Sequence, residues 1–132
     1  MTVGTAGSTR DADRILAAAG TLLAIATVIG ALGAHALERV LAPAQLASLH
    51  TAVDYQFFHA LGLMGVGLLL RSGPRPGLRH VAWLLIAGTV CFCGGIYLML
   101  AGAPSVLGLV TPLGGVLLIA AWLLFAVSVL RR

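Results

Sequence analysis

The stretch ILAAAGTLLAIATVIGALGAHAL, residues 15–37, contains no Asp, Glu, Lys or Arg. A helix of this length rises about 35 Å at 1.5 Å per residue, which is enough to cross the hydrocarbon core of a bilayer with some tilt. Ala34 and Ala36 flank His35 in the Ala-x-Ala pattern of a signal-peptide cleavage site, but the apolar run is about twice the ~7–15 residues of a signal core. The stretch therefore predicts a membrane-spanning helix.

The composition of the whole chain supports this assignment. Of the 132 residues, 60% are hydrophobic and 9% are charged, and the mean hydropathy is +1.05. A soluble domain of this size could not bury so much apolar surface. The net charge of +4 does not indicate a nucleic-acid partner, because the basic residues form short clusters between apolar runs. The composition excludes a soluble enzyme, a disordered tail and a disulfide scaffold.

Three further apolar runs are long enough to cross a bilayer, at residues 53–70, 81–101 and 106–130. The run at 53–70 is the least apolar, and Pro43 is placed to start a helix ahead of it. Short connections rich in Gly, Pro and Ser separate the runs. The sequence predicts an all-α integral membrane protein whose single transmembrane domain, residues 1–132, is an up-down-up-down bundle of four transmembrane helices.

Arginines predict the orientation of this bundle. With four spans, both termini and the loop at 71–80 lie on one side of the membrane. That side carries Arg10, Arg14, Arg71, Arg75, Arg79, Arg131 and Arg132. The opposite side carries only Arg39, in the segment 38–52. Because short cytoplasmic loops are enriched in Lys and Arg, we expect both termini to be cytoplasmic.

Small residues are expected to hold the helices together, because lipid is as apolar as leucine and association depends on close packing. Ala26, Gly30 and Ala34 recur at every fourth residue of the first span and form a flat stripe for another helix. Gly115 provides a similar notch in the last span. These four residues are the predicted helix-packing positions.

Seven polar side chains within the predicted spans fall towards the non-cytoplasmic ends of their helices, and the inner halves hold little beyond Thr21, Thr89, Cys91 and Ser128. The seven are His35, Asp54, Tyr55, Gln56, His59, Tyr97 and Thr111. Ionisable groups inside lipid are costly and are often functional, so this polar layer is the candidate site. Asp54 and His59 lie about 140° apart around one helix, and a histidine–carboxylate pair would have to form between helices.

Several roles are open to this layer. Interhelical hydrogen bonds that stabilise the fold are the simplest. A transport or sensing protein would use His35, Asp54 and His59 as titrating groups. Metal binding lacks a tight H-x-x-x-H motif, and an enzyme acting on lipid headgroups lacks a nucleophile beside a base. We therefore assign no catalytic, cofactor-binding or metal-binding residue, and we expect no cofactor.

Four motifs resemble a known family. They are Gly-Ala-Leu-Gly-Ala-His at 30–35, Tyr-Gln-Phe-Phe-His-Ala-Leu at 55–61, Gly-Gly-Ile-Tyr at 94–97 and Thr-Pro-Leu-Gly-Gly at 111–115. Together they resemble the YgdD-like family of small bacterial inner-membrane proteins (domain of unknown function 423), which is similar to animal transmembrane protein 256. The resemblance covers all four spans.

The resemblance implies a four-helix fold in the bacterial plasma membrane. It also implies that the recurrent polar positions of the family correspond to His35, Tyr55, Gln56, His59, Tyr97 and Thr111. Cys93 and Gly95 stand where related sequences have serines, so no hydroxyl role carries over there. The family brings no established activity. We expect a non-catalytic bundle whose partners are the lipid bilayer and either a second copy or a larger membrane complex, with no nucleic acid.

Overall fold

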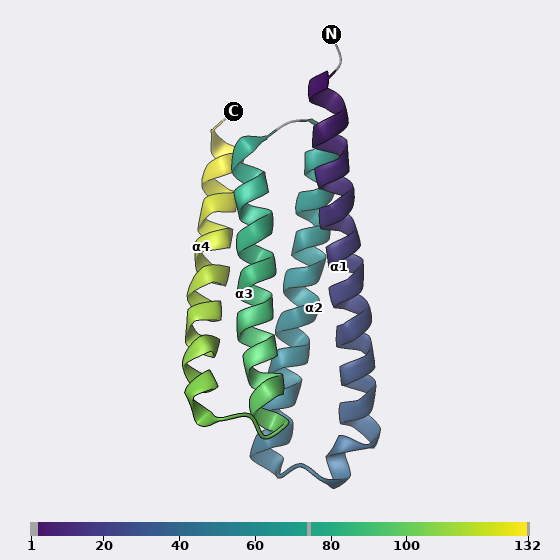
Figure 1. The fold of residues 1–132 in the computed structure, drawn as a ribbon, viewed down its shortest axis with the longest axis vertical. Coiled ribbons are helices and arrows are strands. Elements are labelled where there is room, and N and C mark those ends of the chain that lie inside the picture. The colour runs from purple at the N-terminus through teal and green to yellow at the C-terminus, as the bar shows by residue number, and fades with distance from the viewer. Residues whose placement is uncertain (1–2, 74, 132) are drawn as a thin grey trace.

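A computed structural model of the chain describes residues 3–73 and 75–131, and all the regular secondary structure within them is helical. The elements are α1 (Val3–His35), η1 (Leu37–Arg39), α2 (Pro43–Arg71), α3 (Pro76–Leu100), η2 (Ser105–Leu109) and α4 (Val110–Leu130). The four long helices alternate in direction, and both chain ends lie at the same end of the bundle (Figure 1). Each long helix contains a segment long and apolar enough to cross a membrane. The predicted all-α, four-helix, up-down-up-down architecture is confirmed.

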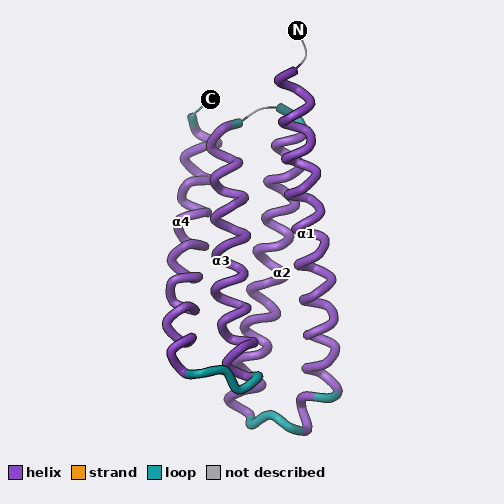
Figure 2. Tube along the Cα trace, in the orientation of Figure 1, coloured by secondary structure: helices purple, strands orange, loops and turns teal. Residues whose placement is uncertain are grey.

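Short connections at the two ends of the bundle join these helices (Figure 2). Pro43 and Pro76 begin α2 and α3. At the first position of a helix a backbone N–H has no carbonyl partner within the helix, so proline loses no hydrogen bond there. The Ala42 N–H donates to Gln45 Oε1 at 2.9 Å and closes the start of α2. The helix expected to start at Pro43 continues without a break into the run at 53–70, so the helix that contains the second predicted span starts ten residues before that run.

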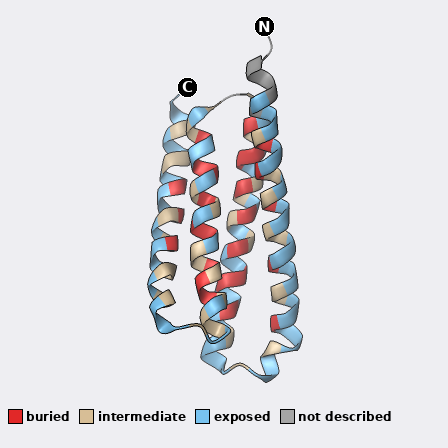
Figure 3. Ribbon diagram, in the orientation of Figure 1, coloured by how far each residue is buried: buried red, intermediate tan, exposed pale blue. Residues whose placement is uncertain are grey.

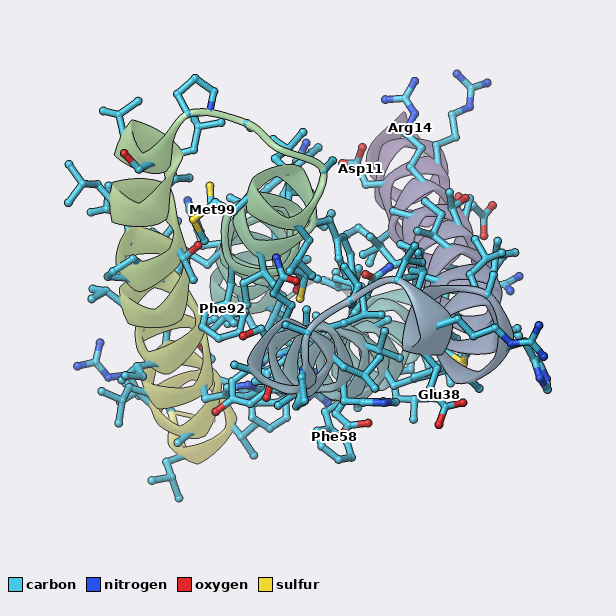
Figure 4. All side chains as sticks on the ribbon, turned by 90° about the horizontal axis from the view of Figure 1, so that it is seen from below. Asp11, Arg14, Glu38, Phe58, Phe92 and Met99 are labelled. Carbon is cyan, nitrogen blue, oxygen red and sulfur yellow. The ribbon has the colours of Figure 1, made fainter. Side chains whose placement is uncertain are left out.

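Helices α2 and α3 form the centre of the bundle, with α1 packed on α2 and α4 packed on α3. Seen along the bundle axis, α1 and α4 lie on opposite edges (Figure 4). In the most apolar part of each helix, 39% and 44% of the residues of α2 and α3 are buried, compared with 17% in α1 and α4. Figure 3 shows the same contrast, with buried residues concentrated on the two central helices. The outer helices therefore turn most of their surface to lipid.

A repeat of seven residues aligns α1 with α2. The buried residues of α1 include Ala12, Ala19, Ala26 and Gly33, and those of α2 include Leu49, Gln56, Leu63 and Leu70. This spacing keeps a seam of side chains facing the partner along two nearly antiparallel helices. A small residue at each α1 position lets the two backbones approach closely.

The predicted packing residues of α1 fit this seam in part. Ala26 is fully buried, and a Cβ on Gly30 would lie 3.3 Å from Val53 Cγ1. Ala34 is exposed, and Gly33 takes its place, where a Cβ would lie 2.9 Å from Leu49 Cδ2. The contact face follows i, i+4, i+7 spacing, because a left-handed seam repeats every seven residues, not every eight.

The tightest approach between helices occurs where α3 crosses α4. A Cβ on Gly114 would clash with the Phe92 backbone N and would lie 2.8 Å from both Phe92 Cα and Gly88 O. The predicted packing residue Gly115 is looser, because its nearest neighbour would be the Phe92 ring at 3.8 Å. At Gly114 the backbones of α3 and α4 therefore approach too closely for a larger residue.

Candidate functional site

Gln56 connects three of the four helices. Its side chain is only 2% exposed. The Nε2 amide donates to the Leu22 backbone carbonyl of α1 at 2.8 Å, and the Oε1 oxygen accepts a hydrogen bond from the Tyr97 hydroxyl of α3 at 2.8 Å. A buried amide without partners would be costly in lipid, so these bonds favour the arrangement in which α1, α2 and α3 meet.

The local sequence places both partners. Gln56 takes one of the seven-residue positions of the α2 seam, where Leu49 and Leu63 stand one repeat before and after it. Tyr97 lies in the last turn of α3, and helical side chains lean towards the start of their helix. The phenol therefore extends towards the centre of the bundle and reaches Gln56.

His59 belongs to an aromatic cluster on the neighbouring face of α2. Its ring centroid lies 5.6 Å from that of Tyr55 and 6.2 Å from that of Trp122 on α4. Tyr55 also stacks on Phe92 of α3 at 4.7 Å. Gly62 makes room for the indole, because a Cβ there would lie 2.6 Å from Trp122 Cζ2. The cluster thus packs α2 against both α3 and α4.

The imidazole of His59 is hydrogen-bonded within its own helix. Its Nδ1 lies 2.6 Å from the Tyr55 carbonyl oxygen. A carbonyl can only accept, so Nδ1 is the donor. In residues 3–73 and 75–131, none of the ion pairs or hydrogen bonds joins a histidine to a carboxylate. His59 is thus oriented by its backbone bond and by ring packing.

The other three predicted site residues stand apart from these contacts. His35 ends α1 and is exposed, and Asp54 is exposed on α2. The Thr111 hydroxyl is buried against Gly95 and has no hydrogen-bond partner among the described residues. The structure therefore joins Gln56 to Tyr97 and, separately, Tyr55 to His59, and it leaves His35, Asp54 and Thr111 outside both pairs.

The predicted polar residues also differ in depth. Gln56 and His59 lie on either side of the midpoint of α2, whereas His35 and Thr111 lie at helix ends. Because α2 begins at Pro43, ten residues before the run at 53–70, Gln56 and His59 lie near the centre of this helix. The polar residues consequently form a central group and a peripheral group along the helices.

The described residues contain no cluster of three His, Cys, Asp or Glu side chains that could hold a metal ion. Cys91 and Cys93 are both free thiols, and Cys93 is buried beside Ala52 and Ile96. The contacts on the central helices are hydrogen bonds and ring stacking. These contacts hold the helices in place.

Two features of the structure were not predicted from the sequence. Asp11 of α1 pairs with Arg79 of α3 at 2.9 Å, and Asp13 pairs with Arg71 of α2 at 3.6 Å. Opposite charges at the same predicted membrane edge were the signal that could have found these pairs. The second feature is the hydrogen bond that the Leu22 backbone carbonyl accepts from Gln56. A backbone acceptor cannot be identified from a pattern of side chains.

Comparison with known proteins places this geometry in context. Residues 29–115 match the family model described as "Protein of unknown function (DUF423)". The chain is 39% identical to the UPF0382 membrane protein YwdK of Bacillus subtilis over 118 residues, which cover 89% of this chain and 94% of that protein. A UPF0382 membrane protein of Staphylococcus epidermidis is 37% identical over 89% of this chain and 93% of its own length.

A more distant relative is the UPF0382 inner membrane protein YgdD of Escherichia coli. It is 30% identical over 107 residues, which cover 81% of this chain and 82% of YgdD. No solved structure matches the chain. The motifs at 30–35, 55–61, 94–97 and 111–115 all fall inside the region matched by the family model.

Proposed function

Because the chain belongs to the DUF423 family and is a small multi-pass membrane protein, we propose that it acts as a non-catalytic helix bundle that associates with a second copy of itself. The observation that carries this proposal is the position of Asp54. Its side chain is exposed on a membrane-spanning helix, and within the described residues it has neither an ion-pair nor a hydrogen-bond partner.

A lone carboxylate on a lipid-facing surface is energetically unfavourable, and such groups usually face a helix partner or a water-filled cavity. Phe58 lies one turn after Asp54 and is 66% exposed. Figure 4 shows its ring pointing away from the other helices. His50 lies one turn before Asp54 and is exposed as well. This outward face of α2 therefore offers a donor, a carboxylate and an aromatic ring.

A two-fold axis along the membrane normal would place this face against its own copy. The His50 imidazole of one copy would then approach the Asp54 carboxylate of the other, twice by symmetry. Association through α2 would remove the lone charge from lipid and would leave the outer surfaces of α1 and α4 free. The proposal accounts for the exposed carboxylate without any chemistry at the central polar group.

Cross-linking tests the proposed interface. In a variant with Cys91→Ser and Cys93→Ala, we expect Phe58→Cys to give a disulfide-linked dimer in nanodiscs on mild oxidation, and we expect Asp54→Leu to reduce that yield several-fold. The matched control is Ile119→Cys on α4, because Ile119 is 63% exposed. Equal cross-linking at the two positions, or none at Phe58→Cys, would contradict association through α2.

We also propose that the protein lies in the bacterial plasma membrane with both termini in the cytoplasm. The support is the arginine distribution, since both chain ends and the connection from α2 to α3 share one end of the bundle (Figure 1). Arg39 is the lone arginine near the opposite end. Short loops rich in arginine are typically retained on the cytoplasmic side.

Reporter fusions measure this orientation. Green fluorescent protein attached after Arg132 is expected to fluoresce in Escherichia coli, and alkaline phosphatase at the same position is expected to be inactive. The reciprocal result is expected for alkaline phosphatase inserted between Val40 and Pro43, in the connection from α1 to α2. An active phosphatase at the C-terminus would overturn the proposed orientation.

A further inference from the structure

A cleft opens where α3 begins beside the end of α4. Its volume is about 560 Å³, which falls in the ~300–1,000 Å³ range typical of small-molecule sites. Below the cleft, Gly77 allows α3 to approach α4 closely, because a Cβ at this position would clash with the Ser128 hydroxyl. The cleft is lined by Arg75, Gly77, Leu124, Val127, Ser128 and Arg131.

The two arginines of this cleft have no counter-ion within residues 3–73 and 75–131. The acids at this end of the bundle, Asp11 and Asp13, are already engaged by Arg79 and Arg71. Two guanidinium groups therefore face the cleft without a carboxylate. Their forked N–H groups match the oxygen atoms of a phosphate.

The start of α3 adds to this positive character. Arg75 is the N-cap residue, and no side chain caps the first turn of the helix. Pro76 has no N–H and the Leu78 N–H donates to the Arg75 carbonyl at 3.1 Å, so the start of this helix attracts an anion mainly through the helix dipole. A phosphate held between the arginines would lie close to this positive end of the dipole.

The wall of the cleft that α4 provides is apolar. Leu124 and Val127 lie below the arginines on the membrane side of the same cleft. An occupant that suits both parts has an anionic head and a hydrocarbon tail. We propose that this cleft binds an anionic phospholipid, with its phosphate over Arg75 and Arg131 and its acyl chain along Leu124 and Val127.

Lipid titration of the purified full-length protein in dodecyl maltoside tests the proposal. Native mass spectrometry is expected to detect tighter binding of dioleoyl phosphatidylglycerol than of dioleoyl phosphatidylcholine. Arg131→Gln and Arg75→Gln are each expected to weaken phosphatidylglycerol binding about fivefold, since one arginine near an anionic lipid contributes about 1 kcal/mol. The double variant is expected to weaken binding about 25-fold.

Arg10→Gln is the matched control, because Arg10 is an exposed arginine of α1 outside the cleft. It is expected to leave phosphatidylglycerol binding unchanged, and the thermal unfolding of all variants verifies their folding. Equal weakening by Arg10→Gln would show general surface attraction and overturn the site. Equal binding of phosphatidylcholine, or full competition by millimolar inorganic phosphate, would overturn the assignment to an anionic lipid.

Discussion

Gly114→Ala is expected to separate α3 from α4 and to lower the free energy of unfolding by about 3 kcal/mol, the upper part of the range for overpacked cores. The added methyl group would meet backbone atoms of Phe92 and Gly88, and backbone atoms cannot rotate away as a flexible side chain can. SDS-induced unfolding in mixed micelles, followed by tryptophan fluorescence, measures the change.

The neighbouring glycine provides the control. A methyl group on Gly115 would reach only ordinary contact with the Phe92 ring, at 3.8 Å. Alanine also favours a helix over glycine by up to about 1 kcal/mol, so Gly115→Ala is expected to be neutral or stabilising. The same substitution at adjacent positions should therefore lower the free energy of unfolding at Gly114 and leave it unchanged or raise it at Gly115. A loss of stability of similar size in both variants would refute the close backbone contact at Gly114.

Gln56→Leu is expected to lower the free energy of unfolding by about 1–2 kcal/mol, because interhelical hydrogen bonds in membranes are each worth about 0.6 kcal/mol and at most about 1.7. Leucine keeps the size of the side chain but removes both the bond to Leu22 and the bond to Tyr97. The Tyr97 hydroxyl then loses its acceptor. The loss should appear in the same unfolding assay.

A double-mutant cycle with Tyr97→Phe isolates the bond between the two side chains. The double variant is expected to lose less stability than the sum of the single variants, by about 0.6 kcal/mol. Thr27→Val is the control, because among the residues that the structure describes the Thr27 hydroxyl bonds only to the Leu23 carbonyl of its own helix. Strict additivity of Gln56→Leu and Tyr97→Phe would argue against a direct hydrogen bond.

The membrane spans and their alternation followed from the sequence because they depend on length and hydropathy alone. The stretch 15–37 is too long and too apolar for any alternative but a spanning helix, and Pro43 marks a helix start by its missing N–H. Such signals are local. They depend on no knowledge of which helices are neighbours.

The rotation of each helix about its own axis did not follow from the sequence. Ala26, Gly30, Gly33 and Ala34 are all small, and spacing alone could not separate the buried Gly33 from the exposed Ala34. In a soluble protein the apolar stripe would mark the buried face, but a helix in lipid is apolar on every side. Gln56 was therefore recognised as a polar residue within a span, whereas its role in joining three helices came only from the packing.

The bond between Gln56 and Leu22 has a consequence for biogenesis. Ribosomes deliver α1 and α2 to the membrane before α3, so the amide of Gln56 can secure the first hairpin while its oxygen still has no donor. The arrival of Tyr97 completes the set. Correct insertion of the third segment thus adds a hydrogen bond that an unfinished chain cannot form. A nascent protein stalled after two helices would expose the Gln56 side-chain oxygen, without its donor, to quality control.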